Sequence, residues 1–173
     1  LATSGHITEA VAIYEQALSL DPTLAITPTR EANRRYAPTV VKQADALAAS
    51  GNITEAVAIY EQALSLDSTL AITPTREANR RYAPTVVKQA DELATSGNIT
   101  DAVASYEQAL ALDATLTLTP TLQANQQYAK ALVTTGDTLA ASGNITDAVA
   151  SYQQALALDA EVKISGQALA GAA

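Results

Sequence analysis

Asn-Ile-Thr, an N-x-Thr acceptor for N-linked sugars, occurs three times in the chain, each time directly after a glycine. The acceptor asparagines are Asn52, Asn98 and Asn144. Thr-Pro-Thr also recurs, and threonine beside proline suits O-linked sugars. Its threonines are Thr27, Thr29, Thr73, Thr75, Thr119 and Thr121. A second interpretation is equally open, because asparagine favours turns, threonine caps helices, and duplication would copy both features.

Catalytic chemistry has little support in the residue types. His6 is the only histidine, and asparagine takes its place at the corresponding positions of the other copies. A nucleophile with its base, or a zinc site, needs a cluster of such groups. Glu15, Glu61 and Glu107 recur at a fixed interval, which is typical of a solvated helix face. We therefore expect a protein without catalytic activity, cofactor or metal.

Composition narrows the possible partners. The net charge is -8, so the chain lacks the basic excess that binding to nucleic-acid phosphates requires. No apolar run approaches the roughly 18 to 20 residues of a membrane span. There is no cysteine and no methionine, while small residues and threonine are abundant. These features favour an extracellular or cell-surface location, with the cytoplasm as the alternative.

The chain repeats itself every 46 residues. Glycine follows this interval at Gly5, Gly51, Gly97 and Gly143, and tyrosine follows it at Tyr14, Tyr60, Tyr106 and Tyr152. A fixed period of this length predicts stacked supersecondary units in one array. The expected boundaries are a partial repeat at 1–24, full repeats at 25–70, 71–116 and 117–162, and a C-terminal tail at 163–173.

Each repeat predicts two helices. Residues 54–66 carry Ala56, Tyr60 and Ala63 on one apolar stripe, with Thr54 as the expected N-cap. The preceding glycine is expected at positive φ, where the previous helix ends.

The other helix is expected to begin at Thr27 and Pro28, with Thr27 as its cap. Pro38 and Pro84 fall inside this helix and predict kinks, whereas Lys130 predicts a straighter third copy.

The spacing of Ala10, Tyr14, Ala17 and Pro22, together with the Gly51-Asn52 turn, resembles the tetratricopeptide repeat. The family's period is shorter, so each unit carries twelve extra residues, first at 25–36. The tryptophan expected early in the first helix is replaced by valine at Val40. The resemblance implies an all-α fold, an α-solenoid of stacked helix-turn-helix repeats whose first helix is elongated and kinked by proline.

The resemblance also implies peptide binding in a groove, where Lys42 and Lys88 would supply cations. The interpretation we favour is that Arg30, Arg34, Arg35 and Lys42 pair with acidic residues of a neighbouring unit. Such surface pairs contribute little individually, typically under about 1 kcal/mol.

The ends of the array suggest self-association. Stacked repeats need polar caps, and neither end resembles one. The apolar residues expected to contact another subunit are Val162, Ile164 and Leu169. The leading hypothesis is a non-catalytic extracellular subunit that assembles head to tail into a fibre and carries glycans at its helix-helix turns. The alternative is a protein- or peptide-binding scaffold segment of a larger protein.

Overall fold

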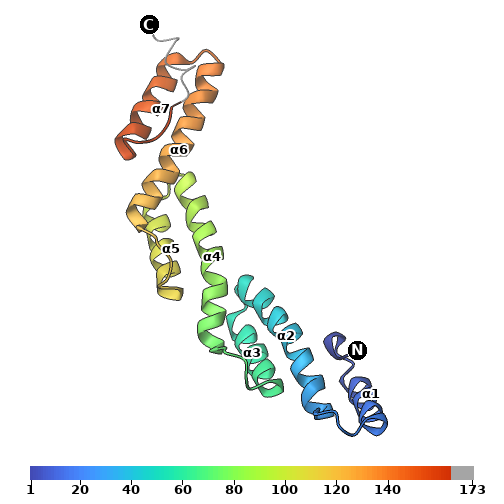
Figure 1. The fold of residues 1–173 in the computed structure, drawn as a ribbon. Coiled ribbons are helices and arrows are strands. Elements are labelled where there is room, and N and C mark those ends of the chain that lie inside the picture. Colours follow the sequence, from blue (N-terminus) through green and yellow to red (C-terminus); the bar gives the residue numbers. More distant parts are fainter. Residues whose placement is uncertain (165–173) are drawn as a thin grey trace. The chain divides into compact units, whose positions relative to one another are not determined.

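The computed structural model describes residues 1–164, and in this part of the chain every regular element is helical (Figure 1). A short 3-10 turn, Ala2–Ser4, comes first. The α-helices are α1 (Ile7–Leu20), α2 (Pro28–Ala49), α3 (Ile53–Leu66), α4 (Pro74–Thr95), α5 (Ile99–Leu112), α6 (Pro120–Ala141) and α7 (Ile145–Leu158). Long and short helices alternate, so the predicted all-α class and the two helices per repeat are confirmed.

The chain divides into two compact units, Leu1–Thr85 and Val86–Ala173, and the boundary falls inside α4. In the first unit α2 packs along α3 and also contacts α1. In the second unit α6 packs along α7 and also contacts α5. Each unit therefore contains the antiparallel helix pair that the repeat predicts.

The long helices begin where the sequence predicts. Thr27 is the N-cap residue of α2 and Pro28 its first helical residue, and Thr119 and Pro120 repeat this start at α6. Proline suits the position because its fixed φ matches the helix and its missing N–H would have had no partner. The hydroxyls of these threonines make no capping hydrogen bond. Residues 28–36 of the twelve-residue insertion thus lengthen α2 at its start.

The turn between the two helices of a repeat is a Schellman motif. Gly51 has φ +90°, and its N–H donates to the carbonyl of Ala48 at 2.9 Å. The N–H of Asn52 donates to the carbonyl of Leu47 at 2.9 Å. The predicted positive φ is found at all four turn glycines.

The prediction that Thr54 caps the short helix is wrong. Helix α3 begins at Ile53, and Asn52 is its N-cap residue. The motif that ends α2 already uses the N–H of Asn52, so the chain enters the next helix immediately. The side chain of Asn52 does not bond to the helix backbone; its amide donates to the Ser50 hydroxyl at 3.3 Å.

The prolines inside the long helices do not split them. Helix α2 is continuous through Pro38, and α4 is continuous through Pro84. Each proline removes one intrahelical hydrogen bond, which for Pro38 leaves the carbonyl of Arg34 without its helical donor. The prediction of one long helix is confirmed, and the kink at each proline stays a prediction.

Alanine dominates the core. In the first unit, Ala44 and Ala48 of α2, Ala56 of α3 and Ala78 of α4 are fully buried around Tyr60. The second unit repeats this cluster with Ala90, Ala94, Ala102 and Ala124 around Tyr106. Alanine lets helix backbones approach closely, and the tyrosine ring supplies the one large apolar surface in each cluster.

Replacing a turn glycine tests the strain at this motif. In Gly51→Ala, the alanine backbone would have to adopt φ +90°, and its Cβ would lie 3.1 Å from the Tyr82 ring. We expect a loss of roughly 1–2 kcal/mol from the left-handed backbone, plus a further loss from the ring contact. Urea denaturation measures the change in the free energy of unfolding.

Gly143→Ala is the matched control, because φ is +84° there but nothing lies within 4 Å of the added Cβ. Equal losses in the two variants would show that the Tyr82 contact contributes nothing.

Candidate protein-interaction surfaces

A tyrosine–aspartate hydrogen bond joins the two helices of each full repeat. The Tyr60 hydroxyl of α3 donates to Asp45 of α2 at 2.5 Å. Tyr106 donates to Asp91 in the same way, and Tyr152 donates to Asp137 at 2.7 Å. The tyrosine rings are buried, so the hydroxyls need an acceptor at the edge of the core. The aspartates provide it at the same place in each repeat.

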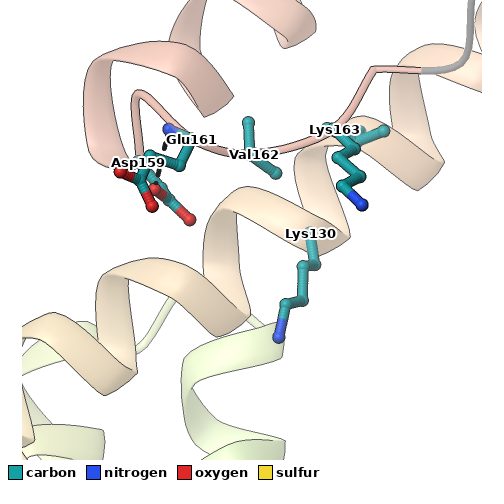
Figure 2. A pocket seen from close by; sticks show the side chains of 6 residues that line it. Lys130, Asp159, Glu161, Val162 and Lys163 are labelled. Carbon is teal, nitrogen blue, oxygen red and sulfur yellow. Dashed lines mark hydrogen bonds between the residues drawn. The ribbon is translucent and has the colours of Figure 1, made fainter.

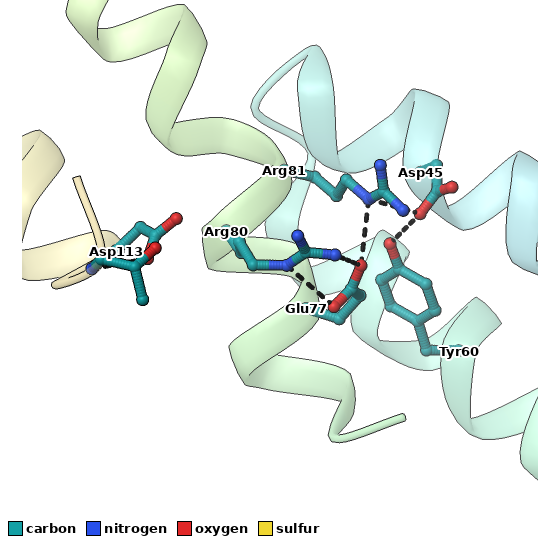
Figure 3. A network of polar contacts seen from close by, with 7 residues as sticks. Asp45, Tyr60, Glu77, Arg80, Arg81 and Asp113 are labelled. Atoms are coloured by element: carbon teal, nitrogen blue, oxygen red, sulfur yellow. Dashed lines mark hydrogen bonds and ion pairs between the residues drawn. The ribbon is translucent and has the colours of Figure 1, made fainter. Parts of the chain in front are cut away.

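Two of these aspartates, Asp45 and Asp91, also accept a donor from the next long helix. The Nε of Arg81 lies 3.0 Å from Asp45 and 3.0 Å from Glu77 (Figure 3). In the second unit, the amide of Gln127 takes this place and donates to Asp91 at 3.1 Å. Because glutamine replaces arginine, the contact between consecutive repeats does not require a cation.

Electrostatics keep these phenols protonated. Burial, followed by the hydrogen bond and the charge of the partner aspartate, raises the pKa of Tyr60 and of Tyr106 well above the ordinary value. The same causes raise the pKa of Tyr152 to about 12. The hydrogen bond from Arg80 lowers the pKa of Glu77, against the opposing effect of burial. At neutral pH the phenol is therefore a stable donor to a carboxylate.

A threonine adds a second link between repeats. The Thr85 hydroxyl of α4 donates to the carbonyl of Ala49, the last residue of α2, at 2.8 Å. The Thr39 hydroxyl makes the same contact to the carbonyl of Thr3 at 2.9 Å. In the third copy this position is Ala131, so that hydroxyl is absent.

The arginines pair mainly within their own helix. Arg34 and Arg35 both bind Glu31, one turn away, at 3.0 and 2.6 Å. The expectation that these two pair with a neighbouring unit is wrong, because Glu31 is reached along the same helix. Arg81, which has the position of Arg35 in the next repeat, does contact the preceding repeat, through Asp45.

The lysines proposed for a peptide groove lie on the surface. Lys42 and Lys88 are both exposed. Lys88 lies 3.9 Å from Glu92, one turn further along α4. Within residues 1–164, Lys42 makes no ion pair. A role for these two lysines in binding a peptide stays a prediction.

The candidate glycosylation residues are accessible. Asn52, Asn98 and Asn144 are exposed N-cap residues of α3, α5 and α7. The six threonines of the Thr-Pro-Thr sequences are exposed at the starts of the long helices. Modification at these residues stays a prediction.

The predicted subunit-contact residues pack partly on their own chain. Val162 and Ile164 lie against the cluster that α6 and α7 form around Tyr152. They occupy the positions that Leu70 and Ile72 have two periods earlier in the chain. Leu169 lies outside the described residues.

A cleft of about 340 Å³ opens where the chain leaves α7 (Figure 2). It is lined by two residues of α6 and four that follow α7: Lys130, Val133, Asp159, Glu161, Val162 and Lys163. The side chains of opposite charge, Lys130 and Lys163 against Asp159 and Glu161, surround the apolar Val162 (Figure 2). The cleft therefore has both charged and apolar walls.

Residues 1–164 contain neither a candidate membrane span nor a candidate metal site. None of the helices there combines the length and apolar character that a bilayer crossing requires. Among the same residues, histidine and acidic side chains do not gather in groups of three or more that could hold a metal ion.

Comparison with known families identifies the class of protein. One model described as tetratricopeptide repeat matches residues 1–24 and 37–70, and a second model of the same description matches residues 87–163. The chain belongs to the tetratricopeptide repeat family. Residues 25–36, the first copy of the twelve-residue insertion, lie between matched segments. A comparison with curated proteins finds no match. The repeats therefore define a scaffold for protein interactions.

The hydrogen bonds that Asp45, Asp91 and Asp137 accept from the tyrosines were not predicted. A signal was present, because each aspartate precedes its tyrosine by 15 residues in every full repeat. This constant separation fits two facing positions on a helix pair.

Removing one phenol tests the aspartate contact. Tyr106→Phe keeps the ring and deletes the hydrogen bond to Asp91. We expect a loss of about 1–2 kcal/mol in unfolding free energy, because a bond to a charged acceptor is stronger than a neutral one. Urea denaturation gives the value. Tyr36→Phe is the control, since its hydroxyl has no hydrogen bond within residues 1–164, and it is expected to change little.

Alkaline pH should unfold the protein through the same bonds. The ordinary tyrosine pKa of 10.0 applies to the unfolded chain, whereas the pKa of folded Tyr152 is about 12. Between these values the unfolded state binds fewer protons, so stability falls as pH rises. Stability from these tyrosines is fully present below about pH 10. Denaturation curves at increasing pH measure the loss of unfolding free energy. An unfolding free energy that does not change above pH 10 would contradict the raised pKa of these tyrosines.

Proposed function

We propose that this chain is the structural subunit of an extracellular fibre in which copies associate head to tail. The observation that carries the proposal is the recurrence of one inter-repeat contact. Arg81 or Gln127 reaches the aspartate of the preceding repeat, while a threonine reaches the end of the preceding long helix. Because the same contact recurs between repeats, a repeat of one copy can stack on a repeat of another copy in the same way. Head-to-tail contacts that do not close into a ring produce filaments.

The surface of the repeats suits an extracellular location. The three Asn-Ile-Thr asparagines are exposed at successive helix-helix turns, so sugars attached there would not interrupt the packing of α2 on α3 or of α6 on α7. The chain contains no cysteine and no methionine that could be oxidised. In this proposal the glycans cover the turns, while the ends of the array contact other copies.

Electron microscopy of the purified protein tests the assembly. We expect filaments with a regular axial step, and we expect deletion of residues 165–173 to abolish them. The deletion retains Val162 and Ile164, which pack on the core of the second unit, so that unit should remain folded. Circular dichroism on the same sample checks that it does.

Lys42→Ala is the control for this experiment, because it alters an exposed residue of the first unit and should leave filaments intact. Intact mass above 17.9 kDa per chain would support glycosylation. Monodisperse particles at the unmodified mass would contradict the fibre and favour a peptide-binding scaffold.

A further inference from the structure

The cations of the chain are concentrated in the twelve-residue insertion. Six of the ten lysines and arginines lie in two copies of one short segment, at residues 30–35 and 76–81. Each copy holds three arginines against one glutamate, in a chain whose net charge is -8. The third copy, residues 122–127, has no charged residue. Because α6 is helical there as α2 and α4 are, the fold does not require these cations.

A cleft of about 400 Å³ lies beside the first copy of this segment. One wall is formed by residues 25–27 and by Arg30, Glu31 and Arg34 of α2. The other wall includes Thr69, from the loop that follows α3. The cleft therefore lies between two consecutive repeats, inside the first unit. Its volume is in the range of small-ligand sites, about 300–1,000 Å³.

Two arginines of the cleft keep donors for a ligand. Arg30 makes no hydrogen bond or ion pair within residues 1–164. Arg34 binds Glu31 through Nε and Nη2, at 3.0 to 3.1 Å, which leaves its Nη1 without an acceptor. The Arg34 side chain is still 57% exposed. Since Arg30 and Arg34 are four residues apart on one face of α2, both can donate to the same anionic group.

The carboxylates near the cleft are already held by other donors. Glu31 is bound by two arginines. Asp67 accepts from the Thr69 hydroxyl at 2.6 Å and from the Thr69 N–H at 3.0 Å. These hydrogen bonds lower the pKa of Asp67, and the charges of Arg34 and Arg30 add to this effect, against the opposing effect of burial. Asp67 forms an ion pair with neither arginine, so the place beside Arg30 is open to an external anion.

The cleft also offers a hydrogen-bond acceptor and an apolar surface. The Thr69 hydroxyl donates its proton to Asp67, so toward a ligand its oxygen can only accept. Ala25 and Ile26 supply the apolar part of the lining. A ligand that fits all of these features carries an anionic group, a hydroxyl and an apolar face. A sugar acid has the three together on one ring.

We propose that this cleft binds a sugar acid, a pyranose ring that carries a carboxylate. The carboxylate accepts from Arg30 and from Nη1 of Arg34. A ring hydroxyl donates to Thr69, and the C–H face of the ring lies against Ile26. The site goes beyond the fibre proposal, since all of its residues belong to one unit of one chain.

The test uses the full chain with sodium glucuronate as the probe. Saturation-transfer difference NMR observes the small ligand, so it works on a monomer and on a filament alike. We expect saturable binding in roughly the millimolar range, because a ligand with so few atoms gains limited binding energy. Glucose, which has the ring without the carboxylate, should give no saturable signal. Acetate, which has the carboxylate without the ring, should bind several-fold more weakly than glucuronate.

Arginine substitutions locate the site. Each is made in both copies at once, so that residues 76–81 cannot mask a loss. Arg34→Gln with Arg80→Gln should weaken binding about three- to tenfold, the effect of losing a charge-assisted hydrogen bond at an exposed place. Arg35→Gln with Arg81→Gln is the matched control, because it removes the same charge from residues that do not line the cleft, and it should leave the affinity unchanged. Both pairs introduce the residue that the third copy already has there, so the variants should fold.

A threonine substitution separates a sugar acid from a bare carboxylate. Thr69→Val with Thr115→Val should weaken the binding of glucuronate and leave that of acetate unchanged, because acetate has no hydroxyl. No saturable binding of glucuronate, equal binding of acetate, or equal losses in the two arginine pairs would each overturn the proposal. Tighter binding of a glutamate-containing peptide than of glucuronate would overturn it in favour of an acidic protein segment.

Discussion

Close approach of helices through alanine is the constraint on which the structure depends. The fully buried positions of both units are almost all alanine, with one tyrosine in each cluster. Helices that approach this closely leave space for one ring and no more, and the hydroxyl of that ring must reach a polar group. The aspartate at the edge of each long helix meets this need. It also provides the acceptor for the next repeat, so one residue serves both contacts.

Much of the fold could be predicted because its signals are local. Proline at the start of a long helix and glycine at its end act through their own backbone angles, and both positions were correct. The Thr54 cap was wrong because the motif around Gly51 brings Asn52 into the capping position two residues earlier. Continuity through Pro38 was correctly expected, since the surrounding helix is long enough to tolerate one missing hydrogen bond.

The contacts between repeats were harder to predict because they join residues far apart in the sequence. Arg81 and Asp45 are separated by most of a repeat, and sequence alone offered Arg35 the same kind of partner. In the structure Arg35 binds Glu31 on its own helix instead, which is the nearest carboxylate. Helix α1 shows the same limit, since it has the same sequence as α3, yet Tyr14 is only half-buried and Tyr60 is fully buried.

The placement of the variable residues has a consequence for how such a chain changes over generations. Residues 1–46 and 47–92 differ at four positions, and all four lie on the surface: Thr3/Ala49, His6/Asn52, Pro22/Ser68 and Ala46/Glu92. An in-frame duplication of 46 codons therefore adds a unit whose buried contacts already fit. Unequal recombination between such copies can lengthen or shorten the molecule in a single genetic event. Length is then a trait that selection can adjust without redesigning the core.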